Sequence, residues 1–225
     1  MSVKTVVRIV RAKGFRGLFR TILKKLFPSN NPYFAWESRN LLKCTAGDEN
    51  ITKFEDCRYQ VIKCPIANHQ RLIGLNGMTG HSIKKAVDHH ENCWIAKKED
   101  LIVGYVWISS KRQQIMSDTG YYFPVNIEQG AYWWRDLYIL PEHRGQRLVE
   151  LLFSGWVKSF NEAKRETLYT EVSPDNITSI KVHGKLGFKE FCRLRMICFI
   201  GMRLYFLTTQ EKYRLKYRFC PHWLY

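Results

Sequence analysis

The stretch from Asp136 to Leu152 has the residue types and the order of an anion-binding site. It reads DLYILPEHRGQRLVELL: an apolar segment runs into Pro141, a short turn contains Arg144 and Gly145, and a second apolar segment follows. This order predicts a strand, a turn and then a helix. The N–H groups and the dipole of a helix N-terminus bind anions, and guanidinium groups suit phosphate oxygens. The stretch therefore suits a diphosphate group.

Two common phosphate-binding motifs are absent from the chain. Neither the Walker pattern G-x-x-x-x-G-K-[ST] nor the dinucleotide pattern G-x-G-x-x-G is present. A second informative stretch, Asn176 to Phe188, reads NITSIKVHGKLGF. It predicts a helix that ends at Gly187 and follows a short strand at 168–172.

Together the two stretches resemble the motifs of the GNAT superfamily of acyl-CoA-dependent N-acyltransferases. The first resembles L-Y-V-x-P-x-[Y/H] followed by [Q/R]-x-x-G-x-[G/A], but Arg147 and Val149 stand where the family has Gly and then Gly or Ala. The second resembles N-x-x-[A/S]-x-x-[L/V]-[Y]-x-K-L-G-F, with His183 in place of Tyr. The order and spacing of the two motifs also agree, and the resemblance covers about residues 58–209.

The resemblance implies a mixed α/β (α+β) fold with a central, mixed and splayed β-sheet flanked by helices. One domain is expected over residues 29–225, preceded by an extension over residues 1–28. The strands at 137–140 and 168–172 should part at their C-terminal ends. The pantetheine arm of acetyl-CoA would lie in that cleft and bind the open strand edge as an added strand would.

The resemblance also implies the contacts of acetyl-CoA, the expected cosubstrate. The strand would bind the pantetheine arm, the turn would hold the diphosphate, and the second motif would line the acyl or pantetheine side. The expected contacts are Leu137, Tyr138, Ile139, Arg144, Gly145, Gln146, Arg147, Leu148, Val149, Asn176 and Ser179. No metal is expected.

The expected reaction is direct attack of a neutral amine on the thioester, for which a base is useful. Asp136 and Glu171 are candidates for the base or for an anchor of the amine, although each could be an ordinary strand carboxylate paired with Arg135 or Lys181. His183 is a candidate for the acid that protonates the departing thiolate. The alternative is a histidine that packs under the acyl chain and transfers no proton.

Three other groups of residues have simpler interpretations. The aromatic residues Trp107 and 132–134 could shape an acceptor pocket, but core packing is the commoner role. His69 and the pair at 89–90 have no metal-ligand pattern and are expected at surface or turn positions. The seven cysteines have irregular spacing and no Cys-x-x-Cys, which favours a reducing compartment and gives no basis for a zinc site.

The charge is concentrated at the two ends of the chain. The net charge is +16, and residues 1–28 contain eight Lys or Arg and no acid. Their apolar residues recur at helical spacing, which predicts a basic amphipathic segment. Such a segment suits an anionic membrane surface, but it could also dock on its own domain. Nucleic-acid binding would rest on charge alone, so no specific nucleic acid is expected.

Periodicity and turn residues predict the following elements. Strands are expected at 58–63, 93–97, 101–110, 132–140, 167–172, 189–200 and 202–208, and helices at 68–77, 82–90, 148–165 and 177–186. Residues 33–57 are weakly patterned and predict no element.

The resemblance predicts an N-acetyltransferase that uses acetyl-CoA and a primary amine of a small molecule, such as an amino sugar or a membrane-associated intermediate. One alternative uses a longer acyl-CoA or an acyl carrier protein. Another is a non-catalytic binding module at a membrane surface. A cytoplasmic location, peripheral on the inner face of the membrane, is expected, and the protein could form a homodimer.

Overall fold

The computed structural model describes residues 34–45, 55–110, 125, 127–159, 167–199, 202–209 and 213–219. The segment 1–28, predicted to be a basic amphipathic helix, lies outside these residues. Within the described part of the chain, no helix has both the length and the apolar character needed to cross a membrane.

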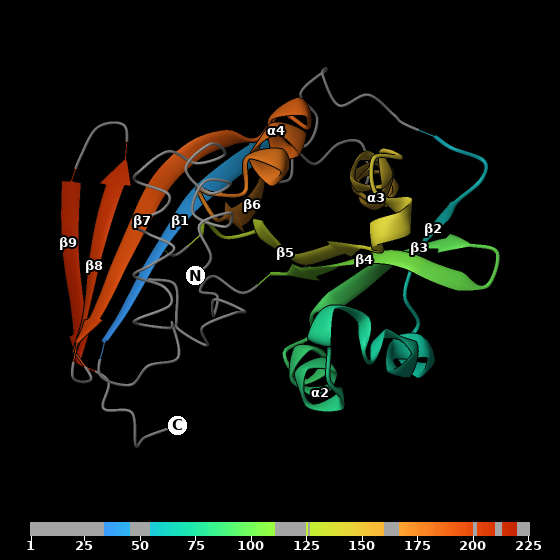
Figure 1. The fold of residues 1–225 in the computed structure, drawn as a ribbon, viewed down its shortest axis with the longest axis horizontal. Helices are drawn as coiled ribbons and strands as arrows, with labels where there is room; N and C mark the ends of the chain where they lie inside the picture. Colours follow the sequence, from blue (N-terminus) through green and yellow to red (C-terminus); the bar gives the residue numbers. More distant parts are fainter. Residues whose placement is uncertain are drawn as a thin grey trace, which may run out of the picture.

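The described strands form one nine-stranded sheet, which runs across the whole molecule (Figure 1). Every neighbouring pair is antiparallel except β5–β6. In spatial order the strands are β2 (Gln60–Lys63), β3 (Asn92–Lys98), β4 (Leu101–Ser109), β5 (Tyr132–Ile139), β6 (Thr167–Val172), β1 (Phe34–Thr45), β7 (Lys189–Phe199), β8 (Met202–Thr209) and β9 (Tyr213–Phe219).

Helices cover both faces of this sheet. On one face lie two 3₁₀ helices, η1 (Ile66–Leu72) and η2 (Leu75–Gly77), and helix α2 (Gly80–Asp88); on the other lie α3 (Leu148–Val157) and α4 (Ile177–Lys185) (Figure 1). A further 3₁₀ turn, η3 (Pro141–His143), precedes α3. The predicted mixed α/β sheet with flanking helices is confirmed.

The sheet is splayed where the sequence predicts it. β5 and β6 are parallel partners only at Tyr132–Leu168 and Trp133–Tyr169. Beyond these pairs β5 continues to Ile139 along β4, while β6 continues to Val172 along β1. The two strands therefore diverge toward their C-terminal ends, and each presents an edge that the other does not pair.

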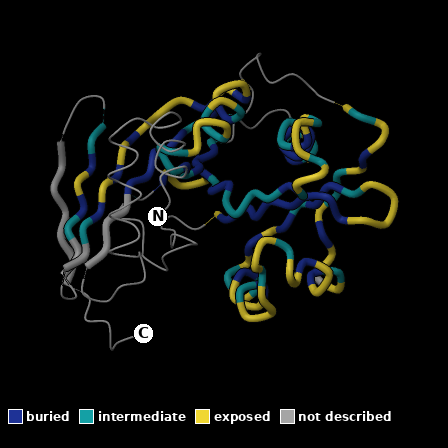
Figure 2. The backbone as a smooth tube through the Cα atoms, in the orientation of Figure 1, coloured by how far each residue is buried: buried dark blue, intermediate teal, exposed yellow. Residues whose placement is uncertain are grey.

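The core lies on both faces of the sheet (Figure 2). Trp134, Phe153 and Trp156 pack between the sheet and α3, whereas Trp107 and Tyr105 pack toward α2. The side chains at Trp107, Trp133 and Trp134 are each at most 2 % exposed. These tryptophans are therefore core residues, as the commoner interpretation anticipated.

Strand β1 is an element that the sequence analysis missed. It inserts between β6 and β7, so that both of its edges are paired. Its neighbouring residues Leu41 and Leu42 are both buried, one in each of two different core clusters. A strand buried on both faces lacks the alternation of polar and apolar residues that predicts a strand.

Candidate functional site

A β-bulge in β5 shapes the start of the site. Tyr105 pairs with Tyr138 and Trp107 pairs with Arg135, so a single residue of β4 lies opposite both Asp136 and Leu137. Asp136 adopts the left-handed backbone conformation, with φ of 50°. Bulges of this kind re-aim side chains and increase the local twist of a strand. Here the bulge lies just beyond the point where β5 leaves β6.

The peptide groups of Leu137 and Ile139 face the open edge. The N–H of Leu140 donates to the carbonyl of Val103 on β4 at 2.9 Å. Since successive peptide groups of a strand point to opposite sides, those of Ile139 and Leu137 point away from β4, toward the gap. The carbonyl of Ile139 accepts a hydrogen bond from Nε of Arg144 at 3.1 Å. This carbonyl is therefore already engaged, and binding of the pantetheine amides at this edge stays a prediction.

The turn between β5 and α3 is shaped by two left-handed residues. Gly145 has φ of 77°, and Arg147, the N-cap of α3, has φ of 57°. The side chain of Arg147 makes no capping hydrogen bond. Because an α-helix leaves its first N–H groups without partners inside the helix, the first turn of α3 retains donors for an anion. The structure therefore fits the predicted diphosphate site.

Basic and polar side chains surround this turn. Arg144 stacks over the ring of Tyr138 at 5.9 Å, and the side chain of Arg147, 53 % exposed, lies 3.5 Å from Glu150. The hydroxyl of Tyr59 donates to Oε1 of Gln146 and lies 3.3 Å from Nδ1 of His143. Tyr59 fixes the Gln146 side chain and was not among the predicted site residues, because it precedes β2 and lies far away in sequence.

Asp136 belongs to a chain of charged groups. Its Oδ2 lies 3.0 Å from Nη1 of Arg135, and Nη2 of Arg135 donates to Oε2 of Glu91 at 2.6 Å. The Glu91 side chain is only 3 % exposed, and Asp136 is 21 % exposed. The pairing of Asp136 with Arg135 agrees with the alternative interpretation of this carboxylate. Glu91 was missed because its turn carries no motif.

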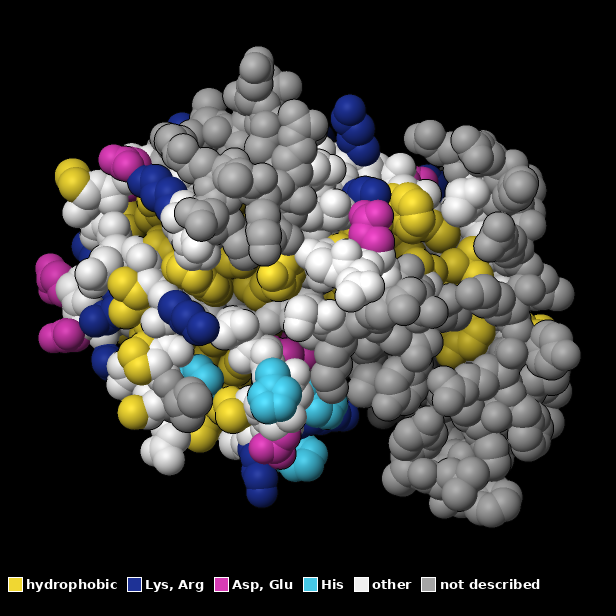
Figure 3. Space-filling model, turned by 180° about the vertical axis from the view of Figure 1, so that it is seen from behind, with side chains coloured by type: hydrophobic (Ala, Val, Ile, Leu, Met, Phe, Trp, Pro, Cys, Tyr) yellow, Lys and Arg dark blue, Asp and Glu magenta, His cyan; other side chains and the backbone are white. Residues whose placement is uncertain are grey.

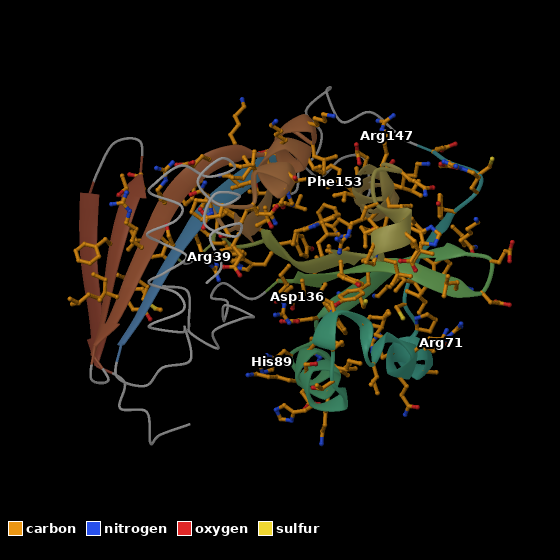
Figure 4. The ribbon with its side chains drawn as sticks, in the orientation of Figure 1. Arg39, Arg71, His89, Asp136, Arg147 and Phe153 are labelled. Atoms are coloured by element: carbon orange, nitrogen blue, oxygen red, sulfur yellow. The ribbon has the colours of Figure 1, made fainter. Side chains whose placement is uncertain are left out.

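The negative charge of Asp136 affects the pKa of the neighbouring Tyr105. Burial, and next the negative charge of Asp136, raise the pKa of Tyr105 to about 12, although a hydrogen bond with Asn76 acts in the opposite direction. The ring also packs against Tyr138 at 5.8 Å. Asp136 therefore lies on the α2 face of the sheet, opposite the α3 face that carries Arg147 (Figure 4).

Glu171 lies on the second of the two diverging strands. It is half-buried and pairs in register with Leu41 of β1. By the alternation of a strand it shares a face with Tyr169, which packs with Trp133 in one core cluster. The two candidate carboxylates thus flank the gap from β5 and β6.

The second motif forms the start of α4. Asn176 is the N-cap, and its Oδ1 accepts a hydrogen bond from the N–H of Ser179 at 3.1 Å. Nδ1 of His183 lies 2.8 Å from the carbonyl of Ser179, so this nitrogen carries the proton and donates. Asn176 is therefore engaged as a helix cap, and its contact with acetyl-CoA stays a prediction.

His183 is a buried, neutral side chain. It is 3 % exposed, burial lowers its pKa, and its ring packs edge-to-face on Phe188 at 5.2 Å. With the proton on Nδ1, Nε2 has no proton to donate to a thiolate. These contacts favour the packing alternative over the predicted acid.

The expectation for His69 is wrong. It lies in η1 but is only 5 % exposed, and it packs edge-to-face on Trp107 at 5.4 Å. The fold buries it because η1 and α2 cover that face of β4. Among the described residues, no group of three or more His, Cys, Asp or Glu side chains could hold a metal ion.

Comparisons with known proteins identify the family. The model of the Acetyltransferase (GNAT) family matches residues 59–188, which is more than half of the chain. The chain therefore belongs to the GNAT acetyltransferase family. The match begins at Tyr59 and ends at Phe188, so it includes β5, the turn before α3, and both motifs.

Solved structures share the fold at low sequence identity. A Drosophila protein is 10 % identical over 83 % of this chain and 58 % of its own, with a TM-score of 0.51. A tandem GNAT protein from the clavulanic acid biosynthesis pathway is 14 % identical over 70 % and 51 %, also with a TM-score of 0.51. The aminoglycoside N-acetyltransferase AAC(6')-Iy, in complex with CoA, is 20 % identical over 58 % and 92 %, with a TM-score of 0.42.

The chain spans just over half the length of the first two of these structures. No curated protein matches it.

Proposed function

We propose that this protein is an N-acetyltransferase that transfers the acetyl group of acetyl-CoA to a primary amine of a small molecule. The observation that carries the proposal is the divergence of β5 from β6, which leaves unpaired by β6 the stretch of β5 that contains Asp136 and precedes α3. Membership of the acetyltransferase family supports the reaction class. The choice of a primary amine as the acceptor rests only on the chemistry of acetyl transfer.

Binding of acetyl-CoA would use the α3 face. The N–H groups of Leu148 and Val149 and the guanidinium groups of Arg144 and Arg147 would hold the diphosphate. The peptide groups of Leu137 and Ile139 would bind the pantetheine amides. The thioester would then lie between the diverging strands, where a strand N–H would polarise its carbonyl.

The acceptor would approach from the α2 face. The neutral amine attacks the thioester carbon, the C–N bond forms, and the C–S bond breaks as the thiolate of CoA departs. Asp136 would take a proton from the nitrogen, directly or through a water molecule. Arg135, held by Glu91, fixes the position of the carboxylate. Glu171 would anchor the amine or replace Asp136 as the base.

The structure favours direct transfer from CoA over the non-catalytic alternative, because a non-catalytic module would need neither the open edge of β5 nor a carboxylate beside it. Transfer from a longer acyl-CoA or from an acyl carrier protein remains the second candidate, favoured by the departures from the family motif at Arg147 and Val149. Competition between acetyl-CoA, longer acyl-CoAs and acyl carrier protein distinguishes these donors.

The test is acetyl transfer to a panel of primary amines, with release of free CoA thiol as the readout. We expect Asp136→Asn to lower kcat by about 10²–10⁴-fold, the typical contribution of a positioned base. We expect the Kd for acetyl-CoA to stay within about twofold, because the diphosphate site lies on the other face. Asp100→Asn, at a fully exposed carboxylate in the β3–β4 turn, is the matched control.

If Asp136→Asn retains wild-type kcat while Glu171→Gln loses it, Asp136 is not the base. If the wild-type protein neither binds acetyl-CoA nor releases thiol with any amine or donor of the panel, the enzymatic proposal itself is wrong.

A further inference from the structure

A cavity of about 580 Å³ lies on the α2 face, beside the pair of Glu91 with Arg135 that holds Asp136. The end of β2, the C-terminal turn of α2 and the start of β3 line it, and its reactive side chains are Cys64, His69, Glu91 and Cys93. Figure 3 shows histidine side chains gathered around this part of the molecule. Neither the family nor the proposed reaction uses the two thiols of this cavity.

The backbone places the two cysteines opposite each other. Lys63 of β2 pairs with Trp94 of β3, so the next residues, Cys64 and Cys93, follow in the same antiparallel register. The N–H of Cys64 donates to the carbonyl of Cys93 at 2.8 Å. Residues opposed in a hydrogen-bonded antiparallel pair have Cα atoms about 5.5 Å apart. A disulfide requires a separation of roughly 4.4–6.8 Å.

Both thiols are free. The thiol of Cys64 donates to the carbonyl of Pro65 at 3.6 Å, and the thiol of Cys93 donates to the carbonyl of Trp94 at 3.8 Å. Each residue is at most 4 % exposed, and both are among the residues that line the cavity.

The surroundings make the two thiols unequal. The interaction with the thiol of Cys93, and to a smaller extent the charge of Arg71, lowers the pKa of Cys64, although its burial acts in the opposite direction. Burial raises the pKa of Cys93. Cys64 is thus the better nucleophile and Cys93 remains a thiol.

His69 provides a proton acceptor in the same cavity. Burial lowers its pKa and favours the neutral imidazole, although a hydrogen bond with the backbone of Cys64 acts in the opposite direction. A neutral imidazole has one ring nitrogen that can accept a proton.

We infer that Cys64 and Cys93 form a reversible oxidation site for small hydroperoxides, with Cys64 as the residue that attacks the peroxide and Cys93 as the resolving residue. The sulfur of Cys64 attacks the peroxide: an S–O bond forms, the O–O bond breaks, and water or an alcohol leaves. Cys64 is oxidised to a sulfenic acid and the peroxide is reduced. The sulfur of Cys93 then attacks that of Cys64, and the S–S bond forms as water leaves with the Cys93 proton.

Other buried cysteines lack this combination. The thiol of Cys44 donates to the carbonyl of Leu186 at 3.3 Å and lies opposite Leu168 in the β1–β6 pairing, not opposite a second cysteine. Cys57 is exposed but lies outside any strand. Both serve as internal comparisons, because general thiol oxidation would not select the Cys64–Cys93 pair.

The test treats the full-length wild-type protein with an equimolar amount of hydrogen peroxide, followed by alkylation, trypsin and mass spectrometry. The peptides 64–71 and 86–97 each contain one of the two cysteines and no other. We expect them to be recovered as one linked species, two hydrogens lighter than their sum and cleaved by dithiothreitol. Recovery of both peptides fully alkylated, while Cys57 is oxidised, would overturn the inference.

Variants test the assigned order of attack. In Cys93→Ser we expect dimedone to label Cys64 after peroxide treatment, and in Cys64→Ser we expect no label at Cys93. Cys57→Ser, the matched control, should form the linked species as the wild type does. If Cys93 in Cys64→Ser is labelled as fast as Cys64 in Cys93→Ser, the assigned order of attack is wrong. If a variant does not fold, the wild-type experiment still decides whether the pair is oxidised.

Discussion

Arg147 shows how one residue can replace the glycine of a family motif. The family pattern has glycine here, and the structure shows why: the position is left-handed, with φ of 57°. A non-glycine residue in this conformation costs about 1–2 kcal/mol. Arg147 retains that strain at the entrance to α3, and its guanidinium lies over the first turn, within 3.5 Å of Glu150. We interpret the substitution as charge gained at the diphosphate site in exchange for backbone strain.

This interpretation predicts opposite effects of Arg147→Gly on stability and on binding. The free energy of unfolding should rise by about 0.5–1 kcal/mol, because glycine adopts the left-handed conformation freely. The Kd for CoA should rise by about tenfold, the loss expected for a charged hydrogen bond to phosphate. Urea denaturation and isothermal titration measure the two quantities. Arg147→Ala should weaken binding equally without the gain in stability; unchanged affinity in both variants would contradict the assigned role.

At the scale of elements, α3 depends on close approach to the sheet. Gly155 of α3 faces β2, and a Cβ at this position would lie 2.4 Å from Cγ1 of Val61. Gly184 of α4 has no atom within 4 Å of the corresponding position. The first glycine therefore sets the distance between helix and strand, whereas the second only lowers the helical propensity of α4.

The two glycines form a matched pair for measurement. We expect Gly155→Ala to lower the free energy of unfolding by about 1–3 kcal/mol through overpacking against Val61. We expect Gly184→Ala to raise it by about 0.4–1 kcal/mol, because alanine restricts the unfolded chain and favours the helix. Chemical denaturation of both variants measures these changes in the free energy of unfolding. Equal effects at the two sites would show that α3 does not rest closely on β2.

At the scale of the whole molecule, the sheet separates two groups of candidate functional residues. The α3 face carries the proposed diphosphate turn, and the α2 face carries Asp136, the buried pair of Glu91 with Arg135, and the cysteine cavity. The basic segment 1–28 lies outside the described residues, so its binding to an anionic membrane stays a prediction. Vesicle sedimentation with and without that segment would test it.

Two buried histidines link the stability of the molecule to pH. Burial lowers the pKa of His69 and of His183 below that of the unfolded chain, which is about 6.5. The unfolded state therefore binds protons first, so the stability is fully present above that value and is lost as the pH falls toward the folded pKa. The midpoint of chemical denaturation should therefore decrease as the pH is lowered from 7.5 to 5.5.

The variants His183→Asn and His69→Asn should each remove part of this pH dependence, and asparagine retains a donor for the carbonyl of Ser179 in the first case. His81→Asn, at an exposed histidine, is the control and should leave the slope unchanged. A slope that is the same in all three variants would show that other groups cause it.

The sequence by itself determined the class of fold, the order of its central elements and the turn between β5 and α3, where diphosphate binding stays a prediction. Alternation in strands such as β3 and the turn residues around Arg144 and Gly145 are local properties, and a family motif is read along the chain. The bulge at Asp136 and the left-handed state of Arg147 have no such local signal.

The tertiary structure alone decided which distant residues meet. It placed Glu91 against Arg135, Tyr59 against Gln146, and Cys64 opposite Cys93, and it inserted β1 between β6 and β7. These contacts depend on strand register and on the packing of helices against each face. Register is set by the burial of many side chains at once, so no single stretch of sequence specifies it.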